Sequence, residues 1–179
     1  MCAFTLRRAP WDPNNIVVHA AGDPVDEPPL YSISVSRKEK PKVVMFYSWD
    51  ATPADIIGNA TFSESILSSS SYLTLRERSM KMKESFLGGE FSLAHTPTGP
   101  MKWKADLLST SRMKLYDRSG KKLAKVDKPG SSGEKKLDLI SDDPDLLELV
   151  LLTYFAALTL NKAFFEIFDE VVEGIFSFQ

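Results

Sequence analysis

Residues 146–160 read LLELVLLTYFAALTL, an apolar run that only Glu148, Thr153 and Thr159 interrupt. Between residues 149 and 158 the run has no polar face, so a helix formed there must be buried on every side. A helix that crosses a bilayer needs about 20 such residues, whereas shorter runs of about 10–14 are more typical of a buried core helix. We therefore interpret this run as a core helix and not as a membrane span.

The residues before this run carry the signals of a helix start. Asp142 and Asp143 precede Pro144, and Asp145 follows it. An aspartate can cap the exposed N–H groups of a first turn, proline suits that turn, and carboxylates favour the positive end of the helix dipole. The sequence thus predicts a helix over residues 144–162.

A helix that is apolar on all sides also limits what can surround it. A sheet packed on one face would leave the other face in water, so the helix needs either lipid or a closed barrel around it, and we favour the barrel. The preceding region supplies short strand candidates, of which 31–36, 101–105 and 113–116 alternate apolar and polar residues, and turn residues such as Gly120 separate them. These candidates lie at 31–36, 43–47, 56–62, 72–75, 91–94, 101–105, 113–116 and 122–126. We predict an α+β, mainly β fold: a closed antiparallel β-barrel around a buried hydrophobic C-terminal helix. The run at 43–47 does not alternate, so we expect both of its faces to be covered.

Two flanking segments complete the predicted organisation. Residues 1–30 contain five prolines, which predict an irregular segment packed on the barrel with one strand at 16–19. The barrel and its helix then occupy residues 31–162. Residues 163–179 repeat apolar residues at helical spacing with acidic residues between them, which predicts an amphipathic helix. We expect this helix either to pack back on the barrel or to join subunits into a homo-oligomer.

Composition excludes several classes of protein. The formal net charge is −2, which argues against a dedicated nucleic-acid binder. Cys2 is the single cysteine, so no intramolecular disulfide can form, and with only two histidines a zinc site is not expected. No phosphate-binding loop or dinucleotide fingerprint is present, and we expect neither a metal nor a cofactor. The first residues do not resemble a signal peptide, so we expect a cytoplasmic protein.

The order of elements resembles a known family. A Lys-Trp-Lys strand at 102–104 is followed by the hairpin sequence KLYDRSGKKLAKV at 114–126, then by a charged loop and a strand, and then by the apolar helix. This order is similar to that of the tubby C-terminal-like barrels, a group that includes the LURP-one-related proteins, the phospholipid scramblases and small fungal relatives. The resemblance covers about residues 31–162 and implies a barrel of about twelve strands threaded by a hydrophobic helix. The acidic, phenylalanine-rich extension after Lys162 departs from that pattern.

Basic residues concentrate on the predicted hairpin. Because alternation can place several of them on one solvent face, they could bind the phosphates of an anionic lipid headgroup. The candidate ligand-binding residues are Arg112, Lys114, Arg118, Lys121, Lys122 and Lys125. The alternative is a solvated barrel exterior whose basic residues face the acidic tail.

Two functions remain open from the sequence. The first is a non-enzymatic barrel that binds a lipid headgroup, an apolar small molecule or a protein partner. The second is a small biosynthetic enzyme with a pocket between the barrel and the N-terminal segment, where His95 and Asp106 act as acid–base groups. A helix that fills the barrel leaves little room for a large internal cavity, so we favour the first function.

Overall fold

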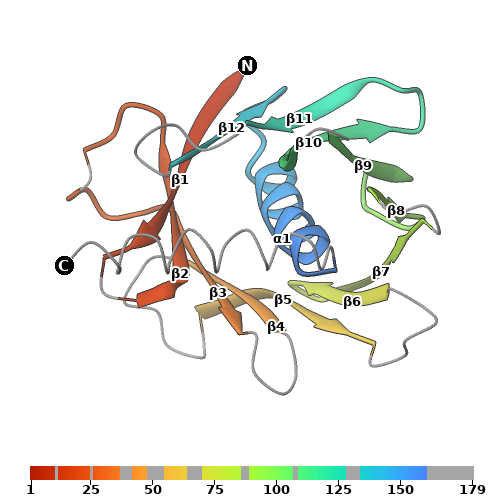
Figure 1. The fold of residues 1–179 in the computed structure, drawn as a ribbon, viewed down its shortest axis with the longest axis horizontal. Coiled ribbons are helices and arrows are strands. Elements are labelled where there is room, and N and C mark those ends of the chain that lie inside the picture. Colours follow the sequence, from red (N-terminus) through yellow and green to blue (C-terminus); the bar gives the residue numbers. More distant parts are fainter. Residues whose placement is uncertain are drawn as a thin grey trace.

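A computed structural model describes residues 1–10, 12–24, 26–36, 42–47, 55–63, 70–85, 89–106, 109–127 and 134–160 (Figure 1). Within them, antiparallel strands form a closed barrel in which every strand pairs with its neighbours in sequence. The ring closes because β1 pairs with both β2 and β12 and matches Cys2 with Leu139. The strands are β1 (Cys2–Ala9), β2 (Asp12–Ala20), β3 (Tyr31–Ser36), β4 (Lys42–Tyr47), β5 (Ile56–Phe62), β6 (Ser70–Leu75), β7 (Arg78–Glu84), β8 (Glu90–Leu93), β9 (Met101–Asp106), β10 (Ser109–Asp117), β11 (Lys122–Val126) and β12 (Lys135–Leu139).

Alternation along the strands sorts side chains between the inside and the outside of the barrel. On β9, Met101 and Trp103 are buried, while Lys104 is exposed. On β10, Met113 and Leu115 are buried, and Lys114 between them is exposed. Because successive side chains point to opposite faces of a strand, the same sequences that fill the core also place lysines on the outer wall.

The single described helix, α1 (Pro144–Leu160), begins with the cap that the sequence predicts. The carboxylate of Asp143 accepts a hydrogen bond from the Asp145 N–H at 3.0 Å, and the Asp143 carbonyl accepts the first helical bond from Leu147. Pro144 therefore occupies the first helical position, where its missing N–H costs nothing.

The barrel encloses α1, as Figure 1 shows. Every residue from Leu146 to Thr159 is buried, which confirms the core-helix interpretation. The hydroxyls of Thr153 and Thr159 bond to carbonyls one turn earlier in the helix, so they are satisfied without water. Gly58 on β5 lets the helix approach closely, because a Cβ there would lie 3.1 Å from a methyl of Leu152. Among the described residues, no helix combines the length and the hydropathy needed to cross a bilayer.

The two ends of the barrel are distinguished by the course of α1. The start rim is the end where α1 begins, and it carries the β6–β7 turn with Arg76 and the β10–β11 turn with Gly120. The end rim is the opposite end, where α1 stops at Leu160 and where β7 and β9 end at Glu84 and Asp106.

Three expectations need correction. The N-terminal segment is not irregular over Cys2–Ala9 and Asp12–Ala20, because these residues form β1 and β2 of the barrel wall and β1 closes it; the strand expected at 16–19 lies within β2. Residues 43–47 are fully covered on one face only: Val43 and Met45 are fully buried, whereas Val44 and Phe46 on the opposite face are half-buried. β7 (Arg78–Glu84) was not among the predicted strands. The predicted tail helix at 163–179 lies outside the described residues.

Candidate functional site

The described surface has a groove of about 880 Å³ on the outer wall, over β7 to β10 (green in Figure 1). We call it the basic groove. Its lining comprises Lys81, Lys83, Ser92, Leu93, Ala94, His95, Pro100, Met101, Lys102, Lys104, Tyr116, Asp117, Arg118 and Gly120. Five of these residues carry a fixed positive charge and one carries a carboxylate, so the groove is strongly cationic.

Strand register builds the groove. Lys83 on β7 pairs with Ser92 on β8, and Ser92 pairs with Lys102 on β9. Lys102 pairs in turn with Tyr116 on β10, so one row crosses four strands. Strands two apart in a sheet are about 10 Å apart, which leaves the small Ser92 as a floor between two lysines.

One carboxylate only partly neutralises this wall. Glu90 binds Lys102 at 3.0 Å and Lys104 at 3.2 Å, and the hydrogen bonds from these two ammonium groups lower the pKa of the Glu90 carboxyl. Lys83 and Arg118 form no ion pair with any described residue. Two lysines thus share one carboxylate while two further cations remain available to an anion.

An aromatic side chain borders the groove next to Lys81. The Lys81 ammonium donates to the Tyr72 hydroxyl at 3.1 Å and lies 4.8 Å from the centre of its ring. Tyr72 is 53% exposed. The interaction holds Lys81 at the edge of the groove, and Tyr72 presents an apolar ring beside the cations.

The hairpin residues proposed from the sequence are only partly brought to this site. Arg118 lines the groove. Lys114 pairs with Lys104 on one side and with Lys125 on the other, so it continues the outer wall beyond the groove. Lys125 binds Asp127 at 2.8 Å. Arg112, Lys121 and Lys122 are exposed on β10 and β11 and at their turn but do not line the groove.

The proposed acid–base pair is not assembled. His95 lines the groove two residues after Leu93, which pairs with Met101 at the beginning of β9, whereas Asp106 is at the other end of that strand. The rise of β9 from Met101 to Asp106 is roughly 17 Å, so His95 and Asp106 lie at opposite ends of this strand. Asp117 also lines the groove, but its carboxylate accepts bonds from the backbone N–H groups of Ser119 and Lys121. Hydrogen bonds within this turn lower the pKa of Asp117, and the largest contribution comes from the Ser119 hydroxyl. The Asp117 carboxylate is therefore charged and engaged within the turn.

Sequence reasoning missed the β7 contribution to the groove. Lys81 and Lys83 alternate with the buried Met80 and Met82, and this period-2 pattern was available as a signal for an outward basic strand. What the pattern could not show is that β7 and β9 flank a strand with small outward residues, because that depends on register.

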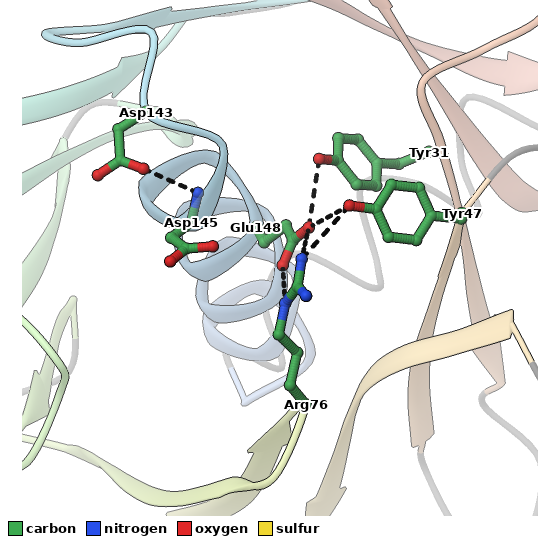
Figure 2. A network of polar contacts seen from close by, with 6 residues as sticks. All are labelled: Tyr31, Tyr47, Arg76, Asp143, Asp145 and Glu148. Atoms are coloured by element: carbon green, nitrogen blue, oxygen red, sulfur yellow. Dashed lines mark hydrogen bonds and ion pairs between the residues drawn. The ribbon is translucent and has the colours of Figure 1, made fainter.

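A second polar cluster lies inside the start rim, and Figure 2 shows its side chains converging on Glu148. The Arg76 guanidinium binds the fully buried Glu148 carboxylate through Nε at 3.0 Å and Nη2 at 2.9 Å. The hydroxyls of Tyr47 and Tyr31 donate to the same carboxylate at 3.0 and 3.4 Å. Burial, and to a smaller extent the charge of Glu148, raises the pKa of Tyr31. The hydrogen bond to Glu148 raises the pKa of Arg76. The carboxylate is fully satisfied, so this cluster anchors the helix.

A third polar contact lies near the end rim. Lys135 on β12 is an inward residue, and its ammonium lies 3.1 Å from the Tyr154 hydroxyl of α1. Burial, with a smaller contribution from the Arg8 charge, lowers the Lys135 pKa to about 7. Burial also raises the Tyr154 pKa.

No group of three or more histidine, cysteine, aspartate or glutamate side chains suited to a metal occurs in the described part of the chain. Comparison with family models, with curated proteins and with solved structures finds no match for this chain.

Proposed function

We propose that this chain is a non-enzymatic binding module whose basic groove takes a phosphorylated ligand, such as the headgroup of an anionic lipid. The observation that carries the proposal is the row in which Lys83 and Lys102 flank Ser92. A phosphate over Ser92 would have two ammonium groups within reach and a hydroxyl beneath it. Lysine serves as a point-charge partner for phosphate, and its long stem can adjust to the ligand.

The shape of the groove favours a headgroup that stays attached to something larger. The groove is on the outer wall and open to solvent, so a ligand can bind there while the remainder of it extends away. An apolar small molecule would need an enclosed cavity, and α1 occupies the barrel interior. These two features support an external anionic ligand over an internal apolar one.

A binding role also agrees with the polar groups that are present. His95 and Asp106 are too far apart to act as an acid–base pair, and Asp117 is engaged in its turn. The sequence resemblance to the tubby C-terminal-like barrels remains a proposal, supported by the closed barrel around a C-terminal helix.

The test is the binding of the full chain to phosphatidylcholine vesicles with and without phosphatidic acid, and to inorganic tripolyphosphate as a soluble probe. We expect binding to tripolyphosphate and to the vesicles that contain phosphatidic acid but not to phosphatidylcholine alone, and weakening of both as salt is raised, because charges are screened beyond about 10 Å at 0.1 M salt. Binding of tripolyphosphate but not of the vesicles would assign the groove to a soluble phosphate. Equal binding to neutral and anionic vesicles would contradict the proposal.

Matched variants locate the site. Lys83→Ala with Arg118→Ala removes two groove cations, and Lys121→Ala with Lys122→Ala removes two cations of the hairpin turn. Each cation near an anionic surface contributes about 1 kcal/mol, so the groove pair should lose roughly tenfold or more in affinity. A larger loss of affinity in the variant Lys121→Ala with Lys122→Ala would show that the ligand binds at the hairpin turn and not in the basic groove.

A further inference from the structure

The basic groove and the acidic tail, defined as residues 163–179, carry opposite charges. The tail holds Glu166, Asp169, Glu170 and Glu173 and no lysine or arginine. The groove holds five cations, against which Asp117 and the bordering Glu90 supply two carboxylates. The two charge patterns therefore attract one another within one molecule.

A single layer of β-sheet separates α1 from the basic groove. Trp103 on β9 points inward, and its indole N–H donates to the Thr153 hydroxyl of α1 at 3.0 Å. Its neighbours Lys102 and Lys104 line the groove on the other side of the same strand. The middle of α1 is thus level with the groove.

The length of the chain after α1 is sufficient to reach around the rim. Leu160 is seven residues beyond Thr153, or roughly 10 Å further along the helix axis. The rim of β9 at Asp106 is three residues beyond Trp103, again roughly 10 Å. Residues 161–165 can span up to roughly 17 Å, so Glu166 is the first acidic residue that can lie outside the wall.

The tail also matches the groove in its apolar residues. Phe164, Phe165 and Phe168 precede or separate the first acidic residues of the tail. The groove presents exposed Ala94 and Pro100 between its cations. Burial of apolar surface would add to the ionic attraction.

We propose that the acidic tail docks in the basic groove of its own chain and competes there with the phosphorylated ligand. Docking rests on the charges and the reach described above. Competition rests in addition on the proposed function. The tail then acts as an internal competitor that sets how much anionic ligand is needed to occupy the groove.

Docking is tested on the full chain by zero-length carbodiimide cross-linking, followed by peptide mass spectrometry. The Glu90–Lys102 ion pair provides an internal positive control, because its two groups are already 3.0 Å apart. We expect links within one molecule from the tail carboxylates to Lys83, Lys102 or Lys104. Formation of the control link without these tail links would overturn the proposal. Tail links found only between two molecules would assign the groove to a second copy and also overturn it.

Competition is tested by neutralising the tail without shortening it, in the variant Glu166→Gln, Asp169→Asn, Glu170→Gln and Glu173→Gln. If the tail occupies the groove about nine-tenths of the time, its release should tighten tripolyphosphate binding roughly tenfold. The control variant Asp26→Asn, Glu27→Gln, Glu77→Gln and Asp142→Asn changes net charge equally at exposed positions away from the groove.

An equal gain in affinity in both variants would show that the gain comes from the change in net charge, and this result would overturn the proposed competition. If neither variant nor the wild type binds the probe, the proposed function fails, and the cross-links still decide whether the tail docks.

Discussion

At the scale of the residue, the ion pair between Arg76 and Glu148 ties the barrel wall to α1. Glu148 is the one charged side chain in the buried part of α1, and Arg76 reaches it from a two-residue turn. Arg76 has φ 54°, a left-handed conformation that costs a non-glycine residue about 1–2 kcal/mol. Arg76 is therefore locally strained, and in this conformation its guanidinium neutralises the Glu148 carboxylate inside the start rim.

Arg76→Ala should lower the free energy of unfolding by about 2–3 kcal/mol, measured by urea titration. Loss of one partner of a buried pair typically costs about 3–5 kcal/mol, and the half-exposed Arg76 allows water to repay part of that. Arg76→Gly should lose less than Arg76→Ala, because glycine adopts positive φ without strain. The double variant Arg76→Ala with Glu148→Leu should be more stable than the sum of the single changes predicts, since it leaves no unpaired charge. Strict additivity would show that the pair does not act as a unit.

Lys135 leads to a prediction about pH. Its pKa is lowered to about 7 in the folded protein, against about 10.5 in the unfolded chain. Between these values the unfolded state binds more protons, so the contribution to stability rises with pH by at most about 1.4 kcal/mol per unit. Lys135→Met should remove the rise that the wild type shows between pH 7 and pH 9 and should be the more stable protein at pH 7. Parallel stability curves for the two proteins across this range would contradict the assignment.

At the scale of the element, α1 is the core of the barrel. Leu152→Asp would place an unpaired carboxylate opposite Gly58, in a position that is fully buried. We expect a loss of several kcal/mol, enough to unfold a domain whose stability is about 5–15 kcal/mol. Circular dichroism melting compares this variant with Leu152→Met, which keeps the volume and should melt within a few degrees of the wild type. A cooperative melt of Leu152→Asp at the wild-type temperature would contradict the central-helix fold.

At the scale of the whole molecule, closure of the barrel removes free strand edges. β1 supplies the last two ladders, and Thr5 pairs with His19 on one side and with Lys136 on the other. Thr5→Pro would remove an N–H from these ladders and expose strand edges that can pair with other chains. We expect this variant to form soluble oligomers by light scattering, whereas Thr5→Val, which keeps the N–H, should retain the wild-type mass. A monomeric Thr5→Pro variant with unchanged melting would show that β1 is dispensable for closure.

What the sequence determined by itself is local. The apolar run at 146–160, its aspartate cap and the alternation on β9, β10 and β11 each involve residues a few positions apart, so helix, strands and the need for a closed wall could be predicted. Burial of Leu149 and Leu158 followed from the absence of any polar face near them. The prolines of the N-terminal segment misled the prediction, because a strand tolerates proline near its start or at an irregularity, and Pro13 lies near the start of β2 where the β1–β2 register shifts.

Only the tertiary structure decided which distant residues meet. Arg76 and Glu148 are 72 positions apart, and neither their pairing nor the entry of β1 beside β12 has a local signal. The basic groove likewise depends on the register that places Ser92 between Lys83 and Lys102. A slip of one residue in any of these ladders would turn the lysines inward and the core residues outward. Register is set by the summed burial of the whole barrel around α1, and for that reason the site exists only in the folded molecule.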